Sequence, residues 1–319
     1  MAKNSKFHTL GLDPKIIAAL DTLGFETPTP IQARVIPLAL NKKDIVGCAQ
    51  TGTGKTASFL LPLLHHLLKS SGRALMPREI ILEPTRELAL QVQKAFKDFS
   101  QRTSLKSCLL IGGESLLKQE KELAQGPDVL IATPGRFLDL FERGRLLLAQ
   151  TQFLIIDEAD RMLDMGFIPD VERIAKSLPN PQRHTLLFSA TMPAPIRKLA
   201  DQFLKAPEEI TISPPATTAE TIDQFLLNTT QKNKISDLTQ LIVQESPKKS
   251  IVFCNRKRDI ANVLKSLQKH GLSPLELHGD LSQKIRSETL ENFHKTPSAL
   301  LIASDVAARG IDVKDLTHV

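Results

Sequence analysis

The chain has 319 residues, which suits two domains of ordinary size. Hydrophobic residues make up 41% and charged residues 24%, the balance of a soluble globular protein, and this excludes a chain too polar to bury a core. The formal net charge of +6 fits a polyanionic partner, although an ordinary solvated basic surface fits it equally well.

The cysteines and the N-terminal segment indicate the cellular compartment of the protein. Cys48, Cys108 and Cys254 lie at no zinc-site spacing and suggest no disulfide framework, which favours a reducing compartment. Residues 1–10 lack the apolar centre of a signal peptide, and the most apolar stretch, residues 60–68, is too short to span a bilayer. We therefore expect a cytoplasmic protein that does not associate with membranes.

Short apolar runs alternate with segments of helical period over residues 1–212. Runs that are apolar at consecutive positions are typical of strands buried on both faces of a parallel sheet, and the alternation indicates βαβ units. The predicted strands are 44–48, 79–82, 107–111, 129–132, 153–156 and 185–188, and helices are predicted at 56–69 and 86–99.

The alternation lapses over residues 213–222, where proline, threonine and alanine predict a linker. It then resumes in a shorter second unit, residues 223–319. The predicted strands there are 224–227, 250–254, 274–278 and 300–303, and the predicted helices are 234–244, 258–270 and 283–294. The chain is thus expected to be α/β, with two units built on parallel sheets.

A glycine-rich segment follows the first predicted strand and reads Ala49-Gln50-Thr51-Gly52-Thr53-Gly54-Lys55-Thr56. It nearly matches the phosphate-binding pattern G-x-x-x-x-G-K-[ST], with alanine in place of the first glycine. Glycines let backbone N–H groups face a phosphate chain, the lysine reaches the outer phosphates, and the final hydroxyl can ligate Mg²⁺. A glycine turn that merely begins a helix is the alternative, and the strand before it argues against that alternative.

Acidic residues follow the predicted strand 153–156 directly, as Asp157-Glu158-Ala159-Asp160. Open α/β sheets bind ligands at the carboxyl ends of their strands. Asp157 would hold Mg²⁺ through water, and Glu158 would orient or deprotonate the attacking water. The alternative is an acidic helix N-terminus, where carboxylates are favoured anyway. Together with the phosphate loop, the acids predict a nucleoside triphosphatase of the P-loop class.

The stretch from Asp157 to Asp160 spells the name of the DEAD-box RNA helicase family, and other motifs along essentially the whole chain resemble that family's in the same order. The resemblance implies two RecA-like P-loop domains and an ATP-dependent RNA helicase, whose RNA-stimulated ATP hydrolysis drives local, sequence-independent unwinding of short duplexes. It implies ATP and Mg²⁺ as cofactors, RNA as partner and a monomer. Glu83 before Pro84 and the run 162–167 are similar to the bacterial RhlE-like branch.

The resemblance also assigns the nucleotide contacts. Residues 24–32 are similar to the family's Q motif, in which Gln32 would read the adenine edge. This resemblance predicts a preference for ATP over GTP. Phe7 would stack on the base, or, alternatively, anchor the N-terminal segment in the core. The residues implied in ATP binding are Phe7, Gln32, Ala49, Gln50, Thr51, Gly52, Thr53, Gly54, Lys55, Thr56 and Asp312, with Thr56 and Asp157 at the metal.

Ser189-Ala190-Thr191 resembles the motif that couples hydrolysis to domain closure, through hydroxyl bonds to Asp160. An ST-turn that caps a helix is the alternative. The residues implied in catalysis are Lys55, Asp157, Glu158, Ser189 and Thr191. Those implied in RNA-backbone binding are Pro84, Thr85, Arg86, Gly113, Thr133, Pro134, Gly135, Arg136, Arg286, Ser304 and Asp305. For a lone arginine a surface salt bridge is the alternative, and the surrounding motif favours RNA.

In the family, an arginine-rich motif VI follows the region that resembles motif V, and this chain ends at Val319 before it. We therefore expect the second domain to be C-terminally incomplete and the chain to be a fragment, with a naturally truncated protein as the alternative. Arginine fingers contribute roughly 10³- to 10⁵-fold in comparable phosphoryl transfer. An ATP- and RNA-binding fragment with little turnover is thus the alternative function, and a P-loop enzyme of another class is a further one.

Overall fold

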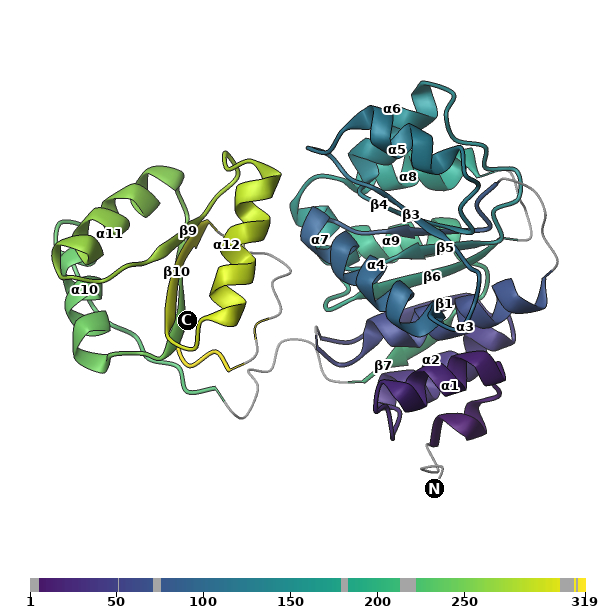
Figure 1. Cartoon of the computed structure of the whole chain (residues 1–319), viewed down its shortest axis with the longest axis horizontal. Helices are drawn as coiled ribbons and strands as arrows, with labels where there is room; N and C mark the ends of the chain where they lie inside the picture. The colour runs from purple at the N-terminus through teal and green to yellow at the C-terminus, as the bar shows by residue number, and fades with distance from the viewer. Residues whose placement is uncertain are drawn as a thin grey trace. The chain divides into compact units, whose positions relative to one another are not determined.

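The computed structural model describes residues 6–50, 52–70, 76–178, 183–212, 222–304, 313 and 315–319. The chain divides into two compact units, Met1–Thr217 and Thr218–Val319, and each has a parallel sheet of its own (Figure 1). None of the helices in these ranges is both long and apolar enough to cross a membrane.

The first unit is built on a seven-stranded parallel sheet with the strand order β3-β4-β2-β5-β6-β1-β7. The strands are β1 (Ile45–Cys48), β2 (Glu79–Leu82), β3 (Ser107–Leu110), β4 (Val129–Ala132), β5 (Phe153–Ile156), β6 (His184–Ser189) and β7 (Glu208–Thr211). The helices are η1 (Lys6–Leu10), α1 (Pro14–Thr22), α2 (Pro30–Leu40), α3 (Lys55–Lys69), α4 (Arg86–Ser100), α5 (Leu116–Leu123), α6 (Pro134–Glu142), α7 (Ala159–Asp164), α8 (Ile168–Ser177) and α9 (Ala194–Phe203).

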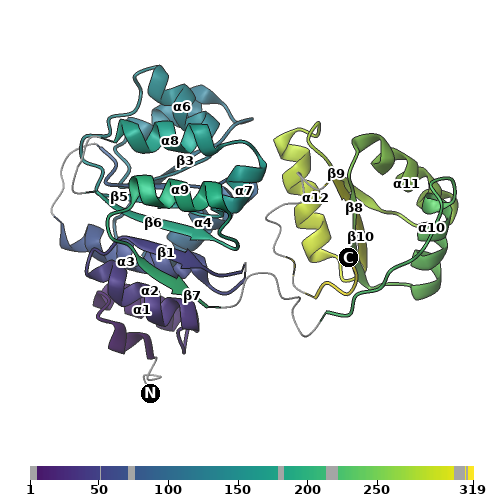
Figure 2. The same cartoon turned by 180° about the vertical axis from the view of Figure 1, so that it is seen from behind.

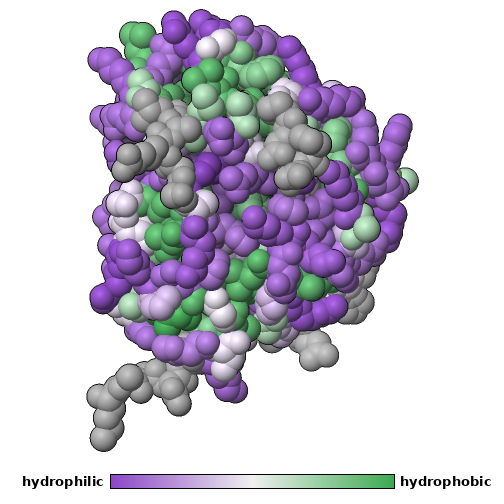
Figure 3. Space-filling view, turned by 90° about the vertical axis from the view of Figure 1, so that its right-hand side faces the viewer, coloured by the Kyte–Doolittle hydropathy of each residue, from purple (hydrophilic) through white to green (hydrophobic). Residues whose placement is uncertain are grey.

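Helices cover both faces of this sheet (Figure 1 and Figure 2), and the period of two along each strand divides its side chains between two cores. In β5, Ile155 packs with α1 to α4, whereas its neighbours Leu154 and Ile156 pack with α6 to α9. Strands that are buried on both faces can be apolar throughout, which is why the short runs in the sequence mark them so clearly. One face of this unit is hydrophilic over most of its surface with scattered apolar groups (Figure 3).

The strand order determines where the functional loops lie. Strands β2, β5, β6 and β1 are consecutive neighbours in the middle of the sheet, and all of them are parallel. Their carboxyl ends therefore share one edge, where the segments that follow these four strands meet. The glycine-rich segment follows β1 and the acidic segment follows β5, so residues about 100 positions apart lie side by side, as the Lys55–Glu158 contact across 103 positions illustrates.

The second unit has a three-stranded parallel sheet with the order β8-β10-β9. Phe293 fills the core on one face of the sheet together with Leu301, and Ile260 and Val263 fill the core that contains Ile302. Near the C-terminus, His318 forms a parallel bridge to Ser250 in β8. The elements are α10 (Lys234–Glu245), β8 (Lys249–Cys254), α11 (Lys257–Lys269), β9 (Leu275–Leu277), α12 (Gln283–Lys295) and β10 (Ala299–Ser304).

Every predicted helix, and every predicted strand but one, is found within one residue at either end. The prediction of a strand at 224–227 is wrong, because residues 222–230 belong to no strand. The run is apolar, but the side chains of Phe225 and Leu226 are 93% and 88% exposed, and no described strand pairs with it. Of the predicted linker 213–222, residues 213–221 lie outside the described residues.

Candidate active site

The glycine-rich segment turns the chain from β1 into α3. Ala49 is buried and extends the pairing with β6 through a bond from its N–H to the Ser189 carbonyl (3.1 Å). Gly52 and Gly54 have φ values of 79° and 91°, a left-handed conformation that L side chains rarely adopt. The Thr53 hydroxyl donates to the Gln50 carbonyl (2.8 Å), which tightens the loop. The first N–H groups of α3 have no carbonyl partner within the helix, so they are available to an anion at its N-terminus.

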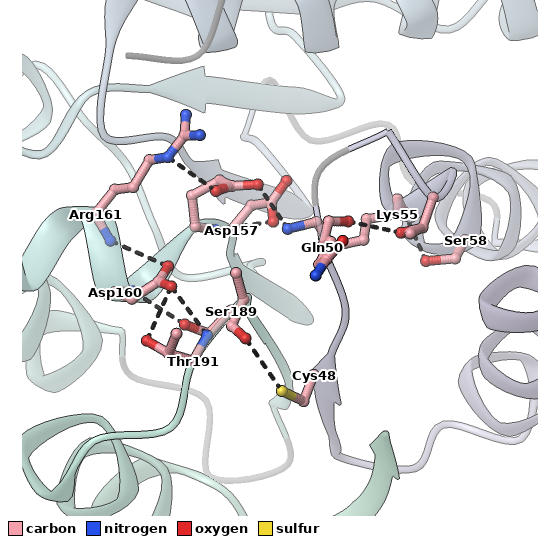
Figure 4. A network of polar contacts seen from close by, with 12 residues as sticks. Cys48, Gln50, Lys55, Ser58, Asp157, Asp160, Arg161, Ser189 and Thr191 are labelled. Carbon is pink, nitrogen blue, oxygen red and sulfur yellow. Dashed lines mark hydrogen bonds and ion pairs between the residues drawn. The ribbon is translucent and has the colours of Figure 1, made fainter. Parts of the chain in front are cut away.

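The acidic segment meets the loop through a buried ion pair. The Lys55 ammonium lies 2.6 Å from Glu158 Oε1, and both side chains are 5% exposed. Arg161, one turn along α7, places its Nε 3.3 Å from Glu158 Oε2. Each of the two cations thus contacts one oxygen of the same carboxylate, and Figure 4 shows the neighbourhood of Lys55 and Arg161. Glu158 itself has φ 52°, a strained conformation for a residue with a side chain.

The charges of the site shift its ionisation equilibria. Burial raises the pKa of Asp157 to about 7, although the field of Lys55 opposes this change. Burial would lower the pKa of Lys55, but the carboxylates of Asp157 and Glu158 outweigh it, so this pKa is raised. Lys55 therefore stays cationic at neutral pH, in position to meet an anion.

The oxygens near the loop suit a magnesium ion that is bound largely through water and phosphate. Thr56 supplies a hydroxyl in the first turn of α3, and Asp157 supplies a carboxylate at the end of β5, both of them hard oxygen donors of the kind that Mg²⁺ prefers. In the described ranges no group of three or more His, Cys, Asp or Glu residues could hold a metal ion by itself. A cage made of protein alone is thus not built here, as is usual where Mg²⁺ arrives with a phosphate chain.

The segment that follows β6 clamps the last acid of the acidic segment. Both the N–H and the hydroxyl of Thr191 donate to Asp160 Oδ2, at 3.0 and 3.1 Å (Figure 4). The Ser189 hydroxyl bonds to Asp160 in another way, because it accepts from the backbone N–H at 3.1 Å. Cys48 donates from its Sγ to the Ala190 carbonyl at 3.5 Å, which ties the end of β1 to the same segment.

Gln32 lies against the phosphate loop. Its Oε1 accepts from the Thr29 N–H (2.9 Å) as part of a capping box at the start of α2, and its Nε2 donates to the Gly54 carbonyl (3.1 Å). The amide is therefore satisfied within the protein, and the side chain is buried. Phe7 is also fully buried and packs edge-on against Phe25. This position favours the alternative reading of Phe7 as an anchor of the N-terminal segment, while the adenine roles of Phe7 and Gln32 remain predictions.

The first unit brings the remaining candidates for RNA contacts to three neighbouring segments, those after β2, β3 and β4. Thr85 caps α4, since its hydroxyl accepts from the Leu88 N–H (3.3 Å), and Pro84 before it is buried. The Arg86 guanidinium covers the backbone of Gly112 and Gly113, so closely that a Cβ on Gly112 would lie 3.2 Å from Arg86 Nη2. A side chain at Gly112 would therefore push the arginine aside, and Gly113, with φ 78°, has a left-handed conformation that favours glycine.

A second arginine reaches the same loop from α6. Arg136 Nη1 donates to the carbonyl of Glu114 at 3.3 Å, and its Nε lies 3.7 Å from Asp139. Thr133 and Pro134 begin α6, and Gly135 is exposed with no atom within 4 Å of a Cβ built on it. Two guanidinium groups thus flank residues 112–114, at the end of the sheet that also carries the phosphate loop.

In the second unit, Arg286 lies in α12 and Ser304 ends β10. Three predicted site residues, Thr51, Asp305 and Asp312, lie outside the described residues. Sequence reasoning missed Arg161 and the bond between Gln32 and Gly54. The i, i+3 spacing of Glu158 and Arg161 on a helix was the signal for the first. Nothing in the local sequence indicates the second.

Two family models match this chain. The model described as DEAD/DEAH box helicase matches residues 29–199, and the model described as Helicase conserved C-terminal domain matches residues 233–319. The first match alone covers more than half of the chain and includes the phosphate loop, the acidic segment and the segment after β6.

Curated relatives agree with this match. The chain is 41% identical over 315 residues to the ATP-dependent RNA helicase CshA of Listeria monocytogenes, covering 99% of this chain and 60% of that protein. It is 39% identical over 313 residues to the DEAD-box ATP-dependent RNA helicase CshA of Bacillus subtilis, covering 98% of this chain and 63% of that protein. The chain thus spans less than two thirds of the length of either relative.

Solved structures are similar over nearly the whole chain. S. cerevisiae Dbp5 bound to RNA and ADP BeF3 superposes with a TM-score of 0.87 at 29% identity, over 98% of this chain and 79% of that one. A DEAD box protein from the hyperthermophile Methanococcus jannaschii has a TM-score of 0.61 at 38% identity, over 97% of this chain and 83% of that one. Both units therefore have the RecA-like α/β fold that the sequence predicts.

Proposed function

The chain belongs to the DEAD/DEAH box helicase family, and we propose that it is an ATP-dependent RNA helicase, in which RNA-stimulated ATP hydrolysis drives local unwinding of short RNA duplexes. The proposal is supported by the CshA relatives, which are named RNA helicases, and by Dbp5, whose structure holds RNA and ADP BeF3. Residues 1–212 would bind ATP, 213–222 would link the domains, and 223–319 would form the second domain.

The observation that carries this proposal is the contact between Lys55 Nζ and Glu158 Oε1 at 2.6 Å. It joins the residue that would bind phosphate to the residue that would orient the attacking water. Lys55 would turn from Glu158 to the outer phosphates, and the loop N–H groups would hold the rest of the phosphate chain. Thr56 and Asp157 would hold Mg²⁺, which neutralises charge that develops on the phosphate oxygens. Glu158 would then accept a proton from, or orient, the attacking water.

The RNA part of the proposal depends on Arg86 and Arg136, which flank residues 112–114. Arginine forks suit phosphate oxygens, and contacts to phosphate carry no sequence information. We therefore propose sequence-independent binding to the RNA backbone. In the second unit Arg286, Ser304 and Asp305 would extend that contact.

Finer features belong to the same proposal. Gln32 and Phe7 would select adenine after ATP has drawn them from their present contacts, and Asp312 would meet the ribose. A monomer that acts in the cytoplasm is the simplest form, and the three cysteines are free and buried, as a reducing compartment would allow. The RhlE-like branch remains a prediction, since the relatives compared above carry the name CshA.

The test is ATP turnover with and without single-stranded RNA, for the parent chain, Lys55→Ala and a matched control, Lys69→Ala. Lys69 lies at the other end of the same helix, and its side chain is 63% exposed. We expect RNA-stimulated turnover that is lost in Lys55→Ala and retained in Lys69→Ala. ATP binding that depends on Lys55, without turnover, would support a nucleotide-binding module instead. Equal turnover in all three proteins would refute the assignment of the site.

A further inference from the structure

Strand β2 carries two buried glutamates without hydrogen-bond partners. Glu79 begins the strand and is 1% exposed, and Glu83, directly after the strand, is 0% exposed. Neither carboxyl group has a hydrogen bond to any part of the chain that the structure describes. A buried carboxyl group without partners is costly, and a protein keeps few of them. Each therefore needs a physical explanation.

Glu83 lies beside the acidic segment because of the strand register. Strands β2 and β5 pair in parallel with Leu82 opposite Ile156, so the next residues along, Glu83 and Asp157, are neighbours. The bonds beyond the strands continue this arrangement, since the Glu83 N–H donates to the Ala132 carbonyl (2.9 Å) and the Asp157 N–H donates to the Leu82 carbonyl (3.1 Å). Glu83 follows β2 and the acidic segment follows β5, and these two strands are neighbours in the sheet.

Charged groups from three elements act electrostatically on the Glu83 carboxyl group. They are Asp157 at the end of β5, Glu158 and Arg161 at α7, and Lys55 at the start of α3. Burial raises the pKa of Glu83 well above its usual range, and the carboxylates of Asp157 and Glu158 raise it further. Three carboxyl groups therefore share a buried space with two cations, and the oxygens of one carboxyl group remain without donors.

We propose that Glu83 is a third carboxyl group of the Mg²⁺–nucleotide site, where its oxygens accept hydrogen bonds from water in the shell of the cation. This inference rests on the proposed ATP site. A dication relieves the repulsion among the carboxyl groups, and its water supplies the donors that the Glu83 oxygens lack. The contact is assigned to water because Mg²⁺ usually keeps several of its waters when it is bound by one or two carboxylates and by phosphates.

Glu79 provides a matched control on the same strand. It lies four residues before Glu83, on the same face of the strand and about 13 Å away at the usual rise per residue. It is buried and unpartnered as well, but the charged groups near it are Arg78 and Asp128, at the opposite end of the sheet from the phosphate loop. A Glu-to-Gln change at either position removes a similar carboxyl group, but only the change at Glu83 would alter a cation site.

The experiment measures the affinity of the whole 319-residue chain for a fluorescent ATP analogue, in EDTA and across a Mg²⁺ titration, for the parent, Glu83→Gln and Glu79→Gln. In Glu83→Gln we expect the gain in affinity that Mg²⁺ confers to fall about tenfold, the usual cost of losing an outer contact to a metal. Binding in EDTA should not fall, because the proposed contact of Glu83 is with water held by the cation, and no cation is bound in EDTA. Glu79→Gln should match the parent in both conditions.

Mn²⁺ in place of Mg²⁺ gives a second readout, because its electron paramagnetic resonance reports binding of the cation itself to the nucleotide complex. An equal dependence on Mg²⁺ in the parent and Glu83→Gln overturns the proposal and leaves the ATP site intact. A loss of binding by Glu83→Gln in EDTA as well means that Glu83 only supports the fold of the loop, which also overturns it. No nucleotide binding by the parent overturns the ATP site and this inference together.

Discussion

Glu158→Gln should bind ATP more tightly and hydrolyse it far more slowly than the parent. Lys55 is held by Glu158 at 2.6 Å, in a contact that is 5% exposed on both sides. At the proposed site ATP would compete with Glu158 for that ammonium group. Glutamine preserves the shape of the side chain and can still accept a hydrogen bond, but it lacks the charge that holds Lys55 back.

The size of the effect follows from the strength of the two contacts. A hydrogen bond to a charged partner contributes about 1.5–3 kcal/mol, and a neutral one about 0.5–1.5 kcal/mol. The difference of about 1 kcal/mol corresponds to roughly fivefold tighter ATP binding. Loss of the base should lower turnover by about 10²- to 10⁴-fold. The assay is equilibrium binding of an ATP analogue in EDTA, which isolates the Lys55 contact from any effect on the cation, together with ATP turnover in Mg²⁺.

Glu172→Gln is the matched control. Glu172 makes an i, i+4 ion pair with Lys176 on α8, so the same chemical change is made in a pair outside the site. It should leave both affinity and turnover at the parent level. Weaker or unchanged binding of the ATP analogue by Glu158→Gln would show that Lys55 is not restrained by Glu158 in solution, and the reasoning would then be wrong.

Two further substitutions test the fold beneath the site and the segment after β6. Gly47→Ala puts a Cβ 2.5 Å from Cδ1 of the fully buried Phe188, and it should destabilise the first unit by about 1–3 kcal/mol. Thermal unfolding measures this loss. Gly135→Ala is the control, because a Cβ built there meets nothing within 4 Å. Thr191→Val removes the hydroxyl bond to Asp160 but keeps the N–H bond. It should leave ATP affinity within about twofold and reduce the duplex separated per ATP hydrolysed by roughly fivefold, because one hydrogen bond contributes about 1 kcal/mol. An unchanged ratio of unwinding to hydrolysis would contradict the coupling role.

The sequence predicted most of the fold because strands buried on both faces must be apolar at consecutive positions. Such runs leave little choice of register, and the predicted strands of the first sheet match the structure within one residue. β7 was missed for the opposite reason, since only Ile210 of its four residues is buried and an edge strand needs no apolar run. The error at 224–227 is the reverse case, an apolar run that forms no strand. Such a run shows that a segment could pair, but it cannot show that a neighbouring strand is present.

The candidate site was predictable in its types of residue but not in its partners. The spacing of glycines, lysine and acids indicated a phosphate loop and an acidic strand end, and parallel strands had to bring them to one edge. The structure adds which groups satisfy one another, such as Arg161 on Glu158 and Gln32 on the Gly54 carbonyl. The i, i+3 spacing of Glu158 and Arg161 is a local signal for the first contact, whereas the second joins residues 22 positions apart and no local pattern encodes it.

The internal pairing of the site has a consequence for how a nucleotide can enter. Lys55 already donates to Glu158, so a phosphate that binds here would have to share the three donors of the ammonium group with that carboxylate or draw the lysine away from it. The same loop contains Gly54, whose carbonyl accepts a hydrogen bond from Gln32. Strand β1 leads into the loop, and its last residue, Cys48, donates to the segment after β6, which in turn binds Asp160. A phosphate that draws Lys55 away therefore acts on a contact that neighbours both the Q-motif amide and the segment after β6. The Lys55–Glu158 pair is for this reason the contact whose two states, closed on the acid or turned to the phosphate, would distinguish the nucleotide-free protein from the nucleotide-bound one.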